Sequence, residues 1–199
     1  MEKSRLEFLT DENSVLLLVD YQPAMFKGVG SGDRTTIKNS ALAVAKAAKI
    51  LNVPVVLTSI RPEGNGEFIP EITELFPDIK VIARKGQSFD ALEDEEVFKQ
   101  IKKSNRKKII LSGLWTSMCF AYTAIHAIRE GRDVYGLMDA GGDASPEAHA
   151  YGVKRMIQAG VIPITRIPVV SEWMHDRLNP KAGKLMKEVY GKYDAIMGA

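Results

Sequence analysis

The feature that most constrains the fold of this chain is a repeated alternation of short apolar runs with segments of helical spacing. The first run, Ser14–Asp20 (SVLLLVD), is continuously apolar, which is typical of a strand buried on both faces of a parallel sheet. Thr35–Leu51 follows with its apolar residues at helical spacing. The other segments predicted as strands have the same short, apolar character: Val53–Ser59, Lys80–Ala83, Lys108–Leu111, Asp133–Met138 and Val161–Ile164.

Segments with helical spacing separate most of these runs. The predicted helices are a short one at Ile69–Leu75, then Glu93–Lys103, Cys119–Glu130, Pro146–Ala159 and a terminal one at Lys181–Tyr190. Strands that alternate with helices favour a parallel sheet, joined by right-handed crossovers and covered on both faces. We therefore predict an α/β fold, a doubly wound three-layer sandwich with about six parallel strands. The chain has 199 residues and no internal repeat, so we expect a single domain over 1–199.

Composition excludes several classes of partner. The 27 Lys and Arg residues nearly balance the 25 Asp and Glu residues, and a net charge of +2 does not favour nucleic acid or an anionic membrane. No apolar run approaches the roughly 18 residues of a transmembrane helix, and the first residues do not resemble a signal peptide. The single cysteine cannot form an intramolecular disulfide. We therefore expect a cytoplasmic protein whose partners are neither nucleic acid nor membrane.

Reactive side chains follow the predicted strands at their carboxyl ends, where open α/β sheets bind ligands. Asp20 closes the first strand, Lys85 follows the third, and Cys119 lies near the start of the helix after the fourth. The amide groups of a helix N-terminus stabilise a thiolate, which is the nucleophilic form of cysteine. A carboxylate can take the thiol proton and return it to a leaving amine, and a neighbouring lysine keeps that carboxylate ionised.

Each of these residues alone is weak evidence for a catalytic site. A lone cysteine such as Cys119 is more often a small buried apolar residue, and a lysine such as Lys85 is usually solvated. Asp20 could equally cap a turn. Their joint placement at one edge of one sheet favours the catalytic interpretation.

Four segments of the chain resemble the isochorismatase-like cysteine hydrolases, most closely the YcaC-type branch, whose substrate is unassigned. They are LLLVDYQPAMF, ARKGQSFDALED, IILSGLWTSMC and DAGGDASPEAH, and the likeness spans about Val15–Trp173. The resemblance implies the strand order 3-2-1-4-5-6 and a catalytic triad of Asp20, Lys85 and Cys119. It implies hydrolysis of a C–N bond in a small amide-like substrate through a thioester. It also implies a homo-oligomer and suggests an octamer.

The resemblance further places a cis, non-proline peptide bond at Leu114–Trp115. The backbone N–H groups of Trp115 and Cys119 would then form an oxyanion hole. Gln22, Phe26 and Trp115 lie beside triad residues in the chain and are candidates for binding substrate. Loop packing explains Gln22 and Phe26 equally well.

Two departures from relatives bear on the chemistry. Ser117 stands where many relatives carry an acidic residue, and Gln22 lies where the nicotinamidase branch has metal-binding histidines. His126, His149 and His175 are far apart and lack the spacing of metal ligands. We therefore expect no metal, no cofactor and no nicotinamidase activity.

Two other functions remain open. Gly28, Gly30 and Gly32 lie between a strand and a helix, as phosphate-binding loops do, but their spacing does not match a dinucleotide or P-loop motif. A nucleotide-binding module is therefore disfavoured. A reactive Cys119 would also suit a non-enzymatic oligomeric scaffold or a thiol redox sensor, although the chain has no second cysteine to resolve an oxidised one. The sequence does not decide the roles of His149, Trp173 or the loop Gly28–Gly32.

Overall fold

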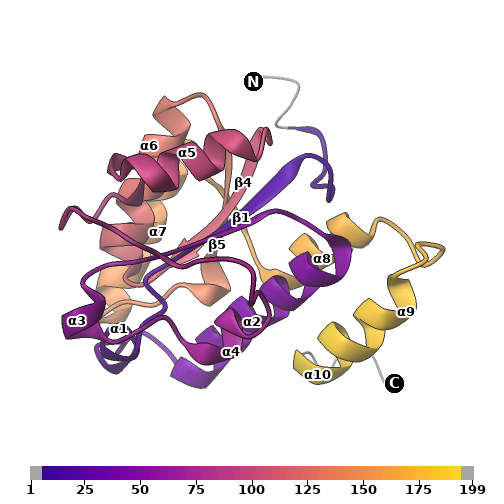
Figure 1. Ribbon diagram of the computed structural model, residues 1–199, viewed down its shortest axis with the longest axis horizontal. Coiled ribbons are helices and arrows are strands. Elements are labelled where there is room, and N and C mark those ends of the chain that lie inside the picture. The colour runs from indigo at the N-terminus through magenta and orange to yellow at the C-terminus, as the bar shows by residue number, and fades with distance from the viewer. Residues whose placement is uncertain (1–5, 194–199) are drawn as a thin grey trace.

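A six-stranded parallel sheet organises the molecule. The computed structural model describes residues 6–193 and has the strand order β3-β2-β1-β4-β5-β6, with helices on both faces of the sheet (Figure 1). The strands are β1 (Ser14–Val19), β2 (Val55–Ser59), β3 (Ile82–Ala83), β4 (Lys108–Gly113), β5 (Asp133–Leu137) and β6 (Ile162–Ile164). The predicted fold class and strand order are confirmed.

Helices fill the connections between the strands and also follow the last strand. They are α1 (Pro23–Lys27), α2 (Arg34–Leu51), α3 (Pro62–Asn65), α4 (Pro70–Thr73), α5 (Glu95–Lys103), α6 (Ala121–Arg129), α7 (Pro146–Gln158), α8 (Arg166–Met174), α9 (Ala182–Leu185) and α10 (Gly191–Tyr193). Within the described part of the chain, no helix has the length and apolar character needed to cross a membrane. The predicted helix at Cys119–Glu130 begins differently, because a π-helical turn, Thr116–Phe120, precedes α6.

The central strand β1 explains why the first apolar run shows no alternation. All six of its residues are buried. Leu16 and Leu18 pack in the core shared with α2 and α8, while Val15, Leu17 and Val19 pack in the core shared with α5, α6 and α7. Figure 1 shows these two groups of helices on opposite faces of the sheet. A strand covered on both faces carries apolar residues at successive positions, as Val15–Val19 does.

Helix α8 is an element that the sequence analysis did not predict. It has Pro168 in its first turn and adjacent β-branched residues, Val169 and Val170, which weaken a helical pattern in sequence. Tertiary packing stabilises it instead, since Val169, Val170 and Trp173 are buried in the core beside α2. This placement answers the open question about Trp173, which is a core residue with 2% of its surface exposed.

Candidate active site

Asp20 lies at the carboxyl end of β1 and is completely buried. Its backbone has φ 60°, in the left-handed region that non-glycine residues seldom occupy. Both of its carboxylate oxygens bind Arg84: Nη1 donates to Oδ1 at 2.9 Å and Nη2 donates to Oδ2 at 2.8 Å. Arg84 is itself only 6% exposed. The strand end therefore carries a bidentate, solvent-shielded ion pair, the geometry in which arginine binds carboxylates most strongly.

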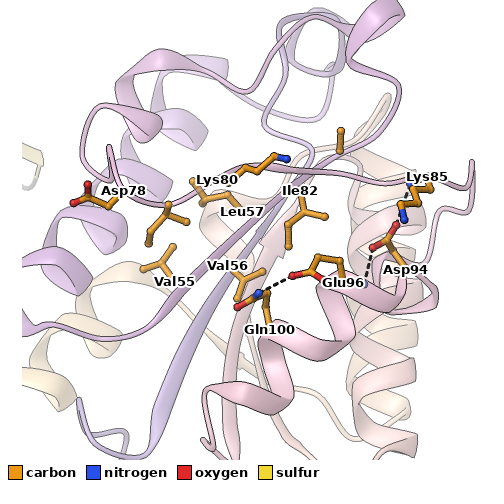
Figure 2. Close-up of a pocket in the computed structure, with 12 residues that line it drawn as sticks. Val55, Val56, Leu57, Asp78, Lys80, Ile82, Lys85, Asp94, Glu96 and Gln100 are labelled. Carbon is orange, nitrogen blue, oxygen red and sulfur yellow. Dashed lines mark hydrogen bonds between the residues drawn. The ribbon is translucent and has the colours of Figure 1, made fainter.

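Arg84 occupies the place beside Asp20 that we expected Lys85 to take. The Arg84 N–H continues the β2–β3 ladder by donating to Ser59 O at 3.0 Å. Lys85 is exposed, and its backbone N–H donates to the Asp94 carboxylate at 3.0 Å. Figure 2 shows Lys85 next to Asp94.

Cys119 is brought to Asp20 by the π-helical turn after β4. Strands β1 and β4 approach closely here. A Cβ atom on Gly113 would lie only 2.7 Å from the carbonyl oxygen of Val19, so this position has no room for a larger residue. Cys119 is 2% exposed, and the Asp20 carboxylate is close enough to act on the pKa of its thiol. The backbone amide of Trp115 favours the thiolate form of Cys119 and lowers the pKa of its thiol in part. The structure thus brings together thiol, carboxylate and guanidinium.

Burial and the neighbouring Asp20 charge raise the pKa of the Cys119 thiol, while Arg84 and the Trp115 amide oppose the rise. The resting form is therefore a protonated thiol. This differs from the thiolate that a helix N-terminus was expected to stabilise. The physical reason is that desolvation disfavours the charged form, and the adjacent carboxylate repels a second negative charge.

Asp20 itself has a raised proton affinity. Burial raises its pKa, and the Arg84 hydrogen bonds and charge, the Cys119 thiol and the Ile60 backbone N–H lower it in part. A carboxyl group of this kind stays ionised through its ion pair but accepts a proton more readily than an exposed aspartate. These properties suit a general base.

The backbone of the turn is fixed by the segment that follows β5. The Leu114–Trp115 peptide bond, where the resemblance places a cis link, is cis in the structure. Thr116 N–H donates to Gly142 O at 2.9 Å, and Ser117 N–H donates to Asp143 Oδ2 at 2.7 Å. The first two amides of the turn are therefore engaged elsewhere.

The three candidates for substrate binding differ in their surroundings. Gln22 is buried, and its side chain donates to Gly66 O at 2.6 Å and accepts from Ile60 N–H at 3.0 Å. Both ends of the Gln22 side-chain amide are thus hydrogen-bonded to backbone groups, which favours a role in loop packing over substrate binding. Phe26 is half-buried against the ring of Tyr21, with centroids 5.8 Å apart.

Trp115 is half-buried, and the glycine-containing loop packs against it. Trp115 Nε1 donates to Met25 O at 2.9 Å, and a Cβ atom on Gly28 would lie 2.3 Å from Trp115 Cζ2. The N–H groups of Gly30 and Ser31 both donate to Asp143 O, at 2.8 and 3.0 Å. The loop therefore forms a rim next to Trp115, and these two amides are not directed at a phosphate.

The three histidines lie apart. His126 pairs with Asp90 at 2.7 Å, His149 pairs with Thr116 at 2.9 Å, and His175 is exposed. In residues 6–193, no group of three or more His, Cys, Asp or Glu side chains could hold a metal ion. His149 is the residue whose contact the sequence could not foresee, because its partner lies 33 positions away.

Two cavities flank the site on the side of β3. One of about 610 Å³ follows the outer edge of β2 (Figure 2) and has the apolar residues Val55, Val56, Leu57 and Ile82 in its wall. Asp20 and Cys119 do not line it, so it is not the reaction centre. A second cavity of about 390 Å³ is lined by Arg84 together with Lys85 and several acidic residues. Arg84 therefore borders this second cavity, whereas Asp20 and Cys119 do not line it.

Comparison with known proteins places this geometry in a family. A model of the isochorismatase domain matches residues 14–167. The probable hydrolase YcaC of Escherichia coli (strain K12) is 34% identical over 176 residues, which cover 88% of this chain and 84% of YcaC. Isochorismatase domain-containing protein 2 of Xenopus laevis is 29% identical over 183 residues, covering 92% and 86% of the two chains.

Comparison with solved structures points to the same family. The crystal structure of the Escherichia coli YcaC gene product, described as an octameric hydrolase of unknown specificity, superposes with a TM-score of 0.87 at 33% identity and covers 94% of this chain and 92% of its own. YcaC from Pseudomonas aeruginosa, solved with hexane-2,5-diol and covalent acrylamide, gives a TM-score of 0.87 at 30% identity, covering 94% and 93%. With the family model matched over most of its length, this chain belongs to the isochorismatase family.

Proposed function

We propose that this chain is a cysteine-dependent hydrolase that cleaves the C–N bond of a small amide-like substrate. The observation that carries the proposal is the burial of the Cys119 thiol beside the Asp20 carboxylate, which Arg84 holds in a bidentate ion pair. A thiol, a base and a residue that orients the base are the parts that nucleophilic catalysis requires.

The reaction begins when Asp20 accepts the thiol proton and Cys119 Sγ forms a bond to the substrate carbonyl carbon. The oxygen becomes an oxyanion, and the backbone N–H groups of Trp115 and Cys119 would donate to it. Breaking the C–N bond transfers the proton from Asp20 to the departing amine and leaves a thioester on Cys119. Asp20 then takes a proton from water, whose oxygen attacks the thioester carbonyl. The acid product leaves, and the proton returns to Cys119.

Arg84 is the third member of the group in this proposal. Its guanidinium orients both oxygens of Asp20, and its charge offsets the negative charge shared by Asp20 and Cys119 during attack. The family resemblance assigned this role to Lys85. Lys85 is exposed and contacts Asp94 through its backbone, so in our proposal it belongs to the outer edge of the site.

The relatives support the assembly. Escherichia coli YcaC is described as octameric. We propose that this chain also forms a homo-oligomer, an octamer by the same similarity. Tyr122 on α6 and Tyr151 on α7 are large apolar side chains with 37% and 67% exposure that a neighbouring subunit would cover.

The test is turnover of a panel of small amides, followed by release of ammonia or amine. Wild type should release amine, and Cys119→Ala and Asp20→Asn should lose the activity by a factor of about 10³ or more. Mass spectrometry of the wild type quenched during turnover should show the acyl group on Cys119. Equal turnover by Cys119→Ala would refute the mechanism. A Cys119 that is alkylated readily but supports no turnover of any amide would favour a thiol sensor.

A further inference from the structure

Helix α7 presents one face to the turn that carries Cys119. His149, Gly152 and Met156 are three and four residues apart, which places them on the same side of the helix. Met156 and Gly152 are buried, and His149 is half-buried. His149 is the first residue on this face, at a position where an inner helix face usually carries an apolar residue.

The histidine contacts the turn directly. His149 Nδ1 lies 2.9 Å from Thr116 Oγ1. Thr116 is completely buried and lies three positions before Cys119. Burial lowers the pKa of His149, although the Asp143 charge opposes this, so the ring is neutral near neutral pH. A neutral ring can accept the Thr116 hydroxyl proton at Nδ1.

The same helix also approaches the backbone of the turn. A Cβ atom on Gly152 would lie 2.9 Å from Ser117 Cα and 3.0 Å from Ser117 N. Asp143, which precedes α7, accepts the Ser117 N–H at 2.7 Å. Two successive residues of the turn, Thr116 and Ser117, are therefore held by the segment from Asp143 to Gly152. The turn has little freedom to rotate while these contacts persist.

We propose that His149 is a positioning residue for the nucleophile: through Thr116, it holds the turn at the angle that directs Cys119 Sγ toward Asp20. This inference rests on the proposed function, since it concerns the alignment of the same thiol and base. His149 does not touch the reacting atoms. Its effect is on the reactivity of Cys119, because a base must lie within hydrogen-bond reach of the proton that it removes.

The test is the rate at which acrylamide modifies Cys119 near neutral pH, followed by mass spectrometry of the intact protein. His149→Ala should slow modification by about tenfold, the effect of one lost neutral hydrogen bond. His149→Asn keeps an acceptor near the position of Nδ1 and should restore the rate to within about twofold of wild type. Thr116→Val, which removes the hydroxyl at nearly constant size, should match His149→Ala.

Controls separate positioning from general loosening of the fold. His126→Ala removes a similar half-buried contact, the 2.7 Å pair with Asp90, and should leave the rate unchanged. Equal slowing by His126→Ala, or failure of His149→Asn to restore the rate, would overturn the inference. If His149→Ala does not fold, Thr116→Val and His149→Asn decide the question. A rate unaffected by His149→Ala but changed by Asp20→Asn refutes only the positioning role. A rate unaffected by both variants refutes the proposed function as well.

Discussion

Arg84 and Lys85 offer a direct test of which cation holds Asp20. Both side chains carry one positive charge, and the residues are adjacent in sequence. Arg84 is buried and binds both oxygens of Asp20, whereas Lys85 is exposed. Replacing each with methionine removes one charge from the same region and retains an unbranched apolar stem. Arg84→Met and Lys85→Met are therefore a matched pair.

The expected loss of stability differs strongly between the two variants. Each hydrogen bond from Arg84 to the buried carboxylate contributes about 1.5–3 kcal/mol. Removing one partner of a buried ion pair costs about 3–5 kcal/mol, because the remaining charge is left without compensation. We therefore expect Arg84→Met to lower the free energy of unfolding by about 3–5 kcal/mol near neutral pH. Lys85→Met should change it by less than about 0.5 kcal/mol, as exposed substitutions do.

The deficit of Arg84→Met should depend on pH. Burial already raises the pKa of Asp20, and loss of the opposing Arg84 charge raises it further. A carboxyl whose folded-state pKa lies above its unfolded value favours folding more at low pH, and this contribution is lost as pH rises through the folded pKa. Below that pKa, Asp20 is neutral in the folded variant, so the cost of an unpaired charge disappears. The stability deficit should therefore shrink as pH falls from neutral toward about 4.

Urea unfolding at a series of pH values, at one fixed protein concentration, measures these differences. The protein concentration must be held constant because assembly of subunits adds to the apparent stability. Equal losses in Arg84→Met and Lys85→Met would refute the assignment of the ion pair. A deficit that does not change between neutral and acidic pH would show that Asp20 does not carry the unpaired charge.

Three further outcomes follow from the same geometry. Since burial and Asp20 raise the pKa of Cys119, its thiolate absorbance should appear only above the ordinary cysteine pKa of about 8.5, and a plateau below that value would contradict this. Gly152→Ala should destabilise the fold by about 1–3 kcal/mol through overpacking against the turn, whereas Gly183→Ala, with open space around it, should be neutral or stabilising in thermal unfolding. Gly28→Ala should displace the Trp115 indole and change tryptophan fluorescence, which an unchanged spectrum would contradict.

Secondary structure could be predicted from the sequence where the pattern of apolar residues matches the pattern of burial. The run Ser14–Val19 could be predicted as a central strand because packing on both faces favours apolar residues at successive positions. Helix α8 was missed because its stability comes from buried contacts rather than from a helical pattern. Asp20 and Cys119 could be placed at one sheet edge because parallel strands align their carboxyl ends.

The choice between Arg84 and Lys85 could not be made from sequence. Strand β3 has only two residues, so it is too short to show by alternation which of the next two positions faces the site. The side is decided by pairing with β2, where the Arg84 N–H binds Ser59 O. The role of His149 was open for a similar reason, since its contact with Thr116 is tertiary.

The protonation state of Cys119 also separates the enzyme from the sensor interpretation. A thiol sensor needs an accessible thiolate, because oxidation to a sulfenic acid follows thiolate character and exposure. Cys119 is 2% exposed, and both burial and Asp20 raise its pKa, so peroxide should oxidise it slowly. A hydrolase does not need a resting thiolate, since Asp20 can remove the proton during attack. The features that make Cys119 a poor sensor are therefore compatible with a nucleophile that becomes reactive only when a substrate carbonyl is positioned against it.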